Sequence, residues 1–350
     1  MNIISISDIH LCRGEADGFC FDKELSRFLR HVISHLSPFE IILNGDIFDL
    51  IAIEDEGDMA QILAEINKEH ALVFDAFREV AKKGHLALVP GNHDYHLKDE
   101  TISSIAGALI PGIEVITSGI YRTGDKSGNV YHFEHGDAHD PWSSLVSPQS
   151  NAPAKTNMIV KNLIQEFLRH PLKILTSSPG GAASEALQRV IKKIKLAEHE
   201  RKLFEDRVVP LIRRFKVNPK TLWELAASLS ARRLKKFGKI YMDMVGAEMA
   251  TGEGPHYREA AGRIAKSMPG TALRVVGFGH THKPEVADLE GGAIYANSGT
   301  WGRDISKDDE GEKFYEITKG TYLLFNQDTL RLRQLILNYF IPPTRRLVMK

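Results

Sequence analysis

The stretch Val-Pro-Gly-Asn-His-Asp at residues 89–94 decides how this chain is organised. An apolar run over residues 86–89 stops there, and the turn that follows carries an amide, an imidazole and a carboxylate in succession. Four other short stretches have the same design, an apolar run that ends in histidine, aspartate or both. They are Asp-Ile-His at 8–10, Gly-Asp-Ile-Phe-Asp at 45–49, His-Gly-Asp at 135–137 and Gly-His-Thr-His at 279–282. The five stretches together indicate one shared site.

Alternating strands and helices place three of these stretches at one edge of a sheet. Short apolar runs at residues 3–6, 41–43 and 86–89 predict buried strands. Between them, a helix that begins near Asp22 has apolar residues at helical spacing, and residues 59–83 predict a second long helix. A βαβαβ order predicts an α/β fold with a mostly parallel sheet and a site at its carboxyl ends.

The chain after Glu114 predicts a second sheet. Short strands are expected at 114–116, 120–123 and 130–134, the last two joined by a turn at 124–129. Strand character returns at 273–280, and further runs at 293–296, 313–317, 321–325 and 330–337 are expected to complete this second sheet. Within the site, Gly45 is expected to allow close approach of the backbone.

Composition limits the class of protein. The chain has 350 residues, 43% of them apolar, which is enough for a full core. Cys12 and Cys20 are the only two cysteines, which favours free thiols in a reducing compartment. No apolar run has the ~18 residues that a membrane-spanning helix needs, and residues 3–7 fit a first strand better than a signal segment. We therefore expect a cytoplasmic protein.

The net charge of zero hides an asymmetry. Residues 151–250 contain 20 Lys and Arg against 9 Asp and Glu, whereas the rest of the chain has 25 against 36. The same region predicts helices and no comparable strand. We expect a catalytic domain at 1–150 and 267–350, and a basic helical insertion or cap at 151–266. Such an insertion can attract an anionic substrate, a membrane surface or nucleic acid, although a solvated helical face explains the same charges.

The polar side chains of the five stretches can hold two divalent ions. Asp8, His10 and His282 are candidates for one ion. Asn92, His135 and His280 are candidates for the second, and Asp46 can bridge the pair. Imidazole and oxygen ligands without thiolates favour Mn, with Fe or Zn as alternatives, in an open and reactive site.

Such a pair makes a bridging water available as hydroxide and neutralises phosphoryl oxygens during an in-line displacement. The leaving oxygen must then receive a proton. His93 is the candidate acid, because an imidazole titrates near neutral pH. We expect the neighbouring Asp94 to hold one ring nitrogen of His93 and to orient the other.

The ordered set closely resembles the calcineurin-like metallophosphoesterase family. Its motifs are Asp-x-His, Gly-Asp-x-x-Asp, Gly-Asn-His-Asp/Glu, a single His and Gly-His-x-His, and all five are present here. The resemblance covers residues 1–145 and 270–330. It implies a four-layer α/β/β/α sandwich of two mixed sheets with outer helices, and the ligand and acid roles given above. It also implies that Asp49 supports the surroundings of Asp46 and does not bind metal.

Within this superfamily, the motifs look most like the branch of UDP-diacylglucosamine hydrolases, which cleave a lipid A precursor. That branch commonly has Arg at the position of His93. The predicted function is therefore a two-metal phosphoesterase that cleaves a phosphodiester, pyrophosphate or phosphomonoester by metal-bridged hydroxide attack. A nucleotide-linked or lipid-linked substrate is the leading specific hypothesis, and peripheral membrane contact through the basic insertion is a further expectation.

Several alternatives stay open. His135 is the least secure ligand because His132 and His139 are close in sequence, and the pair His139-Asp140 fits an ordinary surface position better than a place lining the site. The stretch 297–301 fits either a structural turn or a region in which Trp301 and the nearby Arg303 contact the leaving group. A non-catalytic scaffold and a metal-dependent nuclease are the rival functions, although few aromatic residues interleave the basic ones as single-strand binding requires.

Overall fold

A computed structural model describes residues 1–14, 19, 21–51, 53, 57–140, 162, 256–307, 314–318, 320–326 and 329–335. The helical insertion expected at 151–266 therefore lies outside the described residues, apart from Asn162 and residues 256–266. None of the helices in the described ranges is both long and apolar enough to cross a membrane.

The first sheet is mixed and has six strands in the order β13-β12-β1-β2-β3-β4. Its strands are β1 (Asn2–Ile6), β2 (Phe39–Asn44), β3 (His85–Val89), β4 (Ile113–Val115), β12 (Gly320–Asn326) and β13 (Thr329–Leu335). Strands β1 to β4 are parallel, as the alternation of strands and helices predicts. Strand β12 pairs antiparallel with the free edge of β1, and β13 pairs antiparallel with β12.

This placement corrects one expectation. The run at 114–116 and the strand runs near the C-terminus were expected in the second sheet, but β4, β12 and β13 belong to the first. The β12 strand pairs with the edge of β1 that β2 does not use. The remaining pair, β10 (Arg303–Lys307) and β11 (Phe314–Thr318), forms a separate two-stranded antiparallel ribbon.

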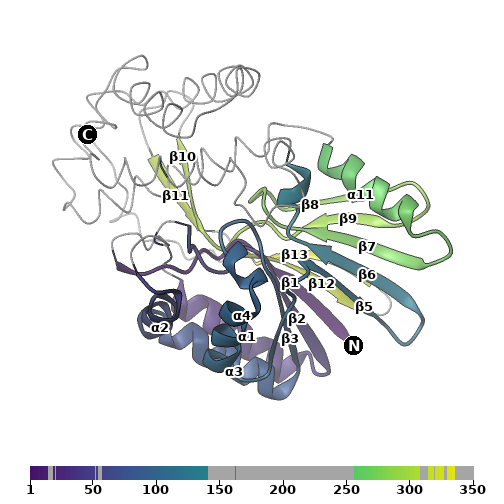
Figure 1. Ribbon diagram of the computed structural model, residues 1–350. Coiled ribbons are helices and arrows are strands. Elements are labelled where there is room, and N and C mark those ends of the chain that lie inside the picture. The colour runs from purple at the N-terminus through teal and green to yellow at the C-terminus, as the bar shows by residue number, and fades with distance from the viewer. Residues whose placement is uncertain are drawn as a thin grey trace, which may run out of the picture.

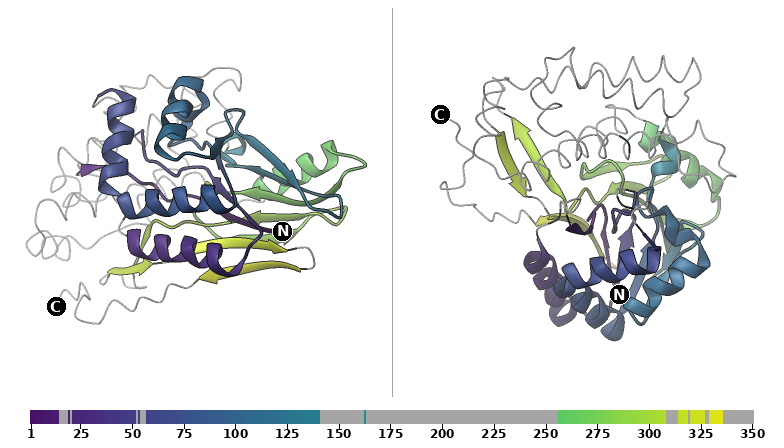
Figure 2. Two further views of the ribbon diagram at one scale, coloured as in Figure 1. Left: turned by 90° about the horizontal axis from the view of Figure 1, so that it is seen from below. Right: turned by 60° about the vertical axis from the view of Figure 1, so that its left-hand side comes forward.

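Four helices cover the outer face of the first sheet (Figures 1 and 2). They are α1 (Asp22–His35), α2 (Met59–Glu69), α3 (Ala71–Lys83) and α4 (Glu100–Leu109). Their apolar faces and the strands form the larger core, in which Leu29 and Phe77 pack with Ile41 and Leu88. The single long helix expected at 59–83 is wrong, because the chain breaks at His70, whose φ of −108° and ψ of 37° are not helical.

The second sheet is also mixed and has five strands in the order β5-β6-β7-β9-β8. Its strands are β5 (Ile120–Gly124), β6 (Asn129–Glu134), β7 (Ala272–Phe278), β8 (Glu285–Asp288) and β9 (Ile294–Asn297). The predicted turn at 124–129 joins β5 to β6 as an antiparallel hairpin. Helix α11 (His256–Ser267) packs on the outer face of this sheet through Tyr257, Ala260 and Ala261.

The two sheets face each other across a second apolar core that includes Ile42 and Val89 from one sheet and Phe133 and Val275 from the other. The layers are therefore helices, sheet, sheet and helix, as the α/β/β/α expectation has it (Figure 2). The carboxyl ends of β1, β2 and β3 from one sheet and of β6 and β7 from the other lead into the five polar stretches. The fold thus brings all five to one edge.

Candidate metal centre

The backbone is strained in three of the five polar stretches, at 8–10, 45–49 and 279–282. Among the described residues, five that are not glycine have a positive φ, between 53° and 67°: Asp8, His10, Asp46, His280 and His282. A left-handed backbone is costly for residues with a Cβ, roughly 1–3 kcal/mol each, and such strain gathers at functional sites. All five belong to the predicted ligand set. The tertiary structure therefore holds these side chains in positions that local preference disfavours.

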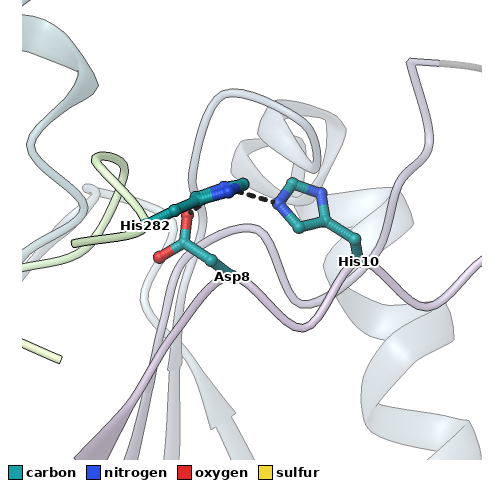
Figure 3. A group of neighbouring side chains, drawn as sticks. All are labelled: Asp8, His10 and His282. Carbon is teal, nitrogen blue, oxygen red and sulfur yellow. Dashed lines mark hydrogen bonds and ion pairs between the residues drawn. The ribbon is translucent and has the colours of Figure 1, made fainter. Parts of the chain in front are cut away.

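Three side chains form a first cluster (Figure 3). The Nε2 atoms of His10 and His282 lie 3.1 Å apart, and Oδ1 of Asp8 lies 3.2 Å from His282 Nε2. Asp8 is fully buried, and the three ligand atoms lie within 4.8 Å of one another. Burial and the neighbouring His93 lower the pKa of His10 to about 3, so its imidazole is neutral, the form that binds a metal ion. The cluster can hold one cation.

A second cluster lies beside the first. The Oδ1 atom of Asn92 is 2.9 Å from His280 Nδ1 and 3.1 Å from His135 Nε2, and Asp46 Oδ2 is 3.1 Å from the same His135 nitrogen. One ligand atom each from Asp46, His135 and His280 lies within 4.8 Å of the others. The outer nitrogen of His135 donates to the Asn44 carbonyl at 3.0 Å, which leaves Nε2 to face the cluster. The cluster can hold a second cation.

The two nearby histidines that made His135 uncertain lie elsewhere. The Nε2 atoms of His132 and His139 face the carboxylate of Glu134, at 3.7 and 2.8 Å. Of the three, the structure brings only His135 into the clusters that could hold a metal ion.

The charge of Asp46 acts on both clusters. Burial alone would raise the pKa of Asp46, but His135 and His93 lower it well below its usual value. In return, burial acts to lower the pKa of His135, yet the Asp46 carboxylate raises it well above its usual value. Asp46 also acts on His10 in the first cluster. A shared anionic carboxylate between two sets of imidazoles is what a bridging ligand for two cations requires.

The donor set fits two divalent ions. Oxygen and imidazole nitrogen atoms converge, and thiolate is not among them, since the Sγ atom of buried Cys12 lies 3.4 Å from the Asp49 carbonyl oxygen. Ring nitrogens that face each other at 3.1 Å, as those of His10 and His282 do, share at most one hydrogen bond. A cation satisfies all the donor atoms of a cluster at once. The geometry therefore matches the expected ligand arrangement.

His93 lies at the edge of the first cluster and pairs with Asp49, whereas Asp94 was the partner expected from the sequence. Its Nδ1 is 2.9 Å from Asp49 Oδ1, and its ring packs edge-on against His10 with centroids 4.7 Å apart. One ligand atom each from His10, Asp49 and His93 also forms a group compact enough for a metal ion. Because this group uses His10 again and its Asp49–His93 contact has hydrogen-bond length, a hydrogen-bonded Asp–His pair explains it better than a third metal site.

The expected contact between Asp94 and His93 is wrong. The Asp94 carboxylate instead accepts backbone hydrogen bonds from Ile47 at 2.8 Å and from Gly91 at 2.6 Å. Burial and the charge of Asp46 raise the pKa of Asp94 to about 6. Asp94 therefore ties the 45–48 turn to the 91–94 turn and does not orient the imidazole. Asp49, the last residue of the Gly-Asp-x-x-Asp stretch, pairs with the imidazole instead, and that motif was the sequence feature that could have indicated it.

Two glycines let these turns approach each other. A Cβ atom on Gly45, which has a φ of 86°, would lie 2.2 Å from Nδ1 of His135. A Cβ atom on Gly91 would lie 2.3 Å from Oδ1 of Asp46. Both distances are impossible for real atoms, so a side chain at either position would push a candidate ligand away. The expectation that glycine permits close approach at Gly45 is confirmed.

The stretch 297–301 supports the site through hydrogen bonds to the backbone of two of the polar stretches. The Asn297 side chain donates to the Gly279 carbonyl at 2.6 Å, and Thr300 Oγ1 donates to the Asp8 carbonyl at 2.7 Å. Trp301 is 1% exposed, packs against Phe28 and donates to a backbone carbonyl of β12. The structural turn is therefore the better alternative for Trp301, because its ring packs against Phe28 and its indole nitrogen is used by the Thr321 carbonyl. The side chain of Arg303 lies outside the described part of the chain. Sequence reasoning missed Asn297 and Thr300 as supports of the site.

A further buried carboxylate, Asp140, was considered for the site but placed at the surface. Asp140, expected at the surface, is fully buried, and its Oδ2 lies 3.7 Å from His280 Nε2. The ring of its neighbour His139 stacks on Phe278. The surface assignment of Asp140 is therefore wrong.

The fold and the paired clusters define a hydrolase with a site for two metal ions. The family model described as calcineurin-like phosphoesterase matches residues 1–284, and the chain belongs to this family. Family membership and the clusters together make it a metal-dependent phosphoesterase. The crystal structure of a dimetal phosphatase from Danio rerio is similar at 12% sequence identity and a TM-score of 0.42, over 95% of each chain. A search of curated proteins found no match.

Proposed function

We propose that the protein is a two-metal phosphoesterase in which Asp8, His10 and His282 hold one ion. Asn92, His135 and His280 would hold the other, and the Asp46 carboxylate would serve both. The observation that carries this proposal is the pair of adjoining buried clusters that share the charge of Asp46. When bound, two divalent ions would supply an activated water and the positive charge that phosphoryl oxygens need.

The residues around the ions divide the remaining work. Asn92 fills a ligand position without adding negative charge close to the phosphate. His93 protonates the leaving oxygen from Nε2, because its Nδ1 is held by Asp49 at 2.9 Å. Asp94 holds the backbone of both turns, so that His93 and Asp46 keep their relative positions.

The proposed substrate is a nucleotide-linked or lipid-linked phosphodiester or pyrophosphate. The branch-like motifs and the basic character of residues 151–250 support it, whereas His93 in place of Arg favours a broader range that includes phosphomonoesters. Manganese is the proposed ion, with Fe or Zn as alternatives, because the donors are oxygen and imidazole nitrogen.

A substrate panel tests this proposal. Mn-loaded protein and its Asp46→Asn variant would be compared on nucleotide-linked pyrophosphates, phosphodiesters and phosphomonoesters. We expect wild-type hydrolysis of at least one diester or pyrophosphate, and loss of that hydrolysis in the variant. Equal rates for the two proteins on every compound would contradict the proposal. Cleavage of DNA or RNA alone would favour the nuclease.

The basic insertion carries a separate expectation. We propose that the basic residues within 151–250 contact an anionic membrane surface. Apart from Asn162, these residues lie outside the described part of the chain. Flotation with vesicles containing an anionic phospholipid at low salt tests it. Failure to float with these vesicles would remove the membrane contact and leave the phosphoesterase proposal standing.

A further inference from the structure

Asp140 is a fully buried carboxylate that the proposed reaction does not use. It follows the short helix η4 (Asp137–His139) at the end of the described range 57–140. A buried carboxylate is costly unless a charged or hydrogen-bonding group faces it. Its Oδ2 atom lies 3.7 Å from Nε2 of His280, within ion-pair distance.

His280 has one ring nitrogen directed into the second cluster and one directed out of it. The inner nitrogen, Nδ1, lies 2.9 Å from Asn92 Oδ1. The outer nitrogen, Nε2, is buried and has no hydrogen-bond partner among the described residues. Tyr257, at the start of α11, lies edge-on to the ring, with centroids 6.1 Å apart. The ring is therefore enclosed, and Asp140 is the carboxylate that faces its outer nitrogen.

The other histidine of the second cluster has the same arrangement. The outer nitrogen of His135 donates to the Asn44 carbonyl at 3.0 Å, while its inner nitrogen faces Asn92 and Asp46. An oxygen atom behind a ligating imidazole fixes which nitrogen carries the proton and increases the basicity of the other. Both histidines of this cluster thus have an oxygen atom behind them.

We propose that Asp140 is a positioning residue for the second metal ion. Its carboxylate, 3.7 Å from Nε2 of His280, would keep the ring proton on that nitrogen by its negative charge, so that Nδ1 would be unprotonated and would face the ion. This inference rests on the proposed two-metal function. It assigns to Asp140 control of the second ion alone, because the first cluster of Asp8, His10 and His282 does not include His280.

Metal titration of three variants tests the inference. Asp140→Ala removes the carboxylate, and Asp140→Asn keeps the shape and a neutral acceptor. Glu40→Gln is the matched control, since Glu40 is 2% exposed and pairs with His85 at the opposite end of the first sheet. Binding of Mn²⁺ would be measured by calorimetry, and the electron paramagnetic resonance spectrum would distinguish paired ions from single ions.

The expected result is a loss of affinity for the second ion only. Asp140→Ala should weaken that ion by about 10- to 100-fold, Asp140→Asn by less, and the first ion should be unaffected. At Mn²⁺ concentrations that fill both sites of the wild type, Asp140→Ala should give the single-ion spectrum. Glu40→Gln should bind both ions as the wild type does.

Two results would overturn the inference while leaving the proposed function intact. One is an Asp140→Asn variant that binds each of the two ions as tightly as the wild type does. The other is an equal weakening of both ions in a folded Asp140 variant. If Asp140→Ala does not fold, as circular dichroism would reveal, Asp140→Asn decides alone. A wild type that binds no pair of ions would remove the proposed function and this inference together.

Discussion

The two ends of strand β2 each place an acidic side chain in a buried setting with histidines, yet the settings differ. Glu40, near the amino end, is 2% exposed and accepts hydrogen bonds from Tyr121 and, at 2.9 Å, from Thr123. His85 Nδ1 lies 2.9 Å from the same carboxylate. Protein donors from both sheets therefore satisfy Glu40.

Asp46, just past the carboxyl end, is also 2% exposed. Its backbone is left-handed, and the imidazoles around it face one another and other acceptor atoms. The lesson is that burial of a carboxylate beside histidine does not by itself indicate a metal site. Strained backbone and ligand atoms that converge on one another distinguish the end of β2 that we propose binds cations.

Replacing Asp46 or Glu40 by its amide should give the largest difference in activity between the two ends of β2. Asp46→Asn removes the shared negative charge, and we expect kcat to fall by at least ~1000-fold, comparable to the loss of a principal transition-state contact. Glu40→Gln should retain most of the activity and lower stability by about 1–3 kcal/mol, because one buried donor loses its acceptor. Steady-state kinetics and urea unfolding measure the two effects. A Glu40→Gln variant as inactive as Asp46→Asn would remove the distinction.

Metal removal should affect one end only. Ions that bind the folded chain at 100 times their Kd stabilise it by about 2.7 kcal/mol per site. Chelation should therefore lower the Tm of the wild type and of Glu40→Gln by the same amount. The Tm of Asp46→Asn should respond much less. Thermal unfolding with and without chelator measures this, and an equal shift in all three proteins would argue against ions at Asp46.

Substitutions of His93 and Asp49 test the proposed proton donor near the carboxyl end of β2. His93→Ala should lower kcat by about 100-fold or more, and most for substrates with poor leaving groups, while both ions stay bound. Asp49→Asn should give a smaller loss with the same dependence on the leaving group, because Asp49 orients Nδ1. Asn92→Ala should instead weaken the second ion. A His93→Ala loss that is equal for good and poor leaving groups would remove the proton-donor role.

The turn of the hairpin between β5 and β6 offers the smallest effect, because its carboxylate, Asp125, belongs to neither end of β2. Burial acts to raise the pKa of Asp125, but the hydrogen bonds from Asn129 lower it below its usual 3.8. The carboxylate thus contributes stability above that pH and loses it as the pH falls through the folded pKa. Asp125→Asn should cost about 0.5 kcal/mol at pH 7. Unfolding at several pH values measures whether the cost shrinks in acid, and a constant cost would contradict it.

Much of the fold follows from local sequence patterns. The apolar runs before Asp8, Gly45 and Gly91 form β1, β2 and β3, and parallel pairing then brings their carboxyl ends together. The seven predicted ligands could be named from the sequence because each lies at the end of such a run, and the structure brings all seven into the two clusters.

What could not be predicted depends on the direction of side chains and on pairing at a distance. Asp94 follows His93 directly, but neighbouring side chains in a turn point apart, so a residue 44 positions earlier, Asp49, reaches the imidazole. The burial of Asp140 depends on the packing of α11 and η4. Likewise, apolar alternation predicts β12 as a strand but cannot state which sheet edge it joins.

Anomalous X-ray diffraction from crystals of Mn-loaded protein tests the central claim most directly. The account predicts two peaks per chain, one among Asp8, His10 and His282 and one among Asn92, His135 and His280, with Asp46 in contact with both. A single peak, or peaks away from these residues, would contradict it.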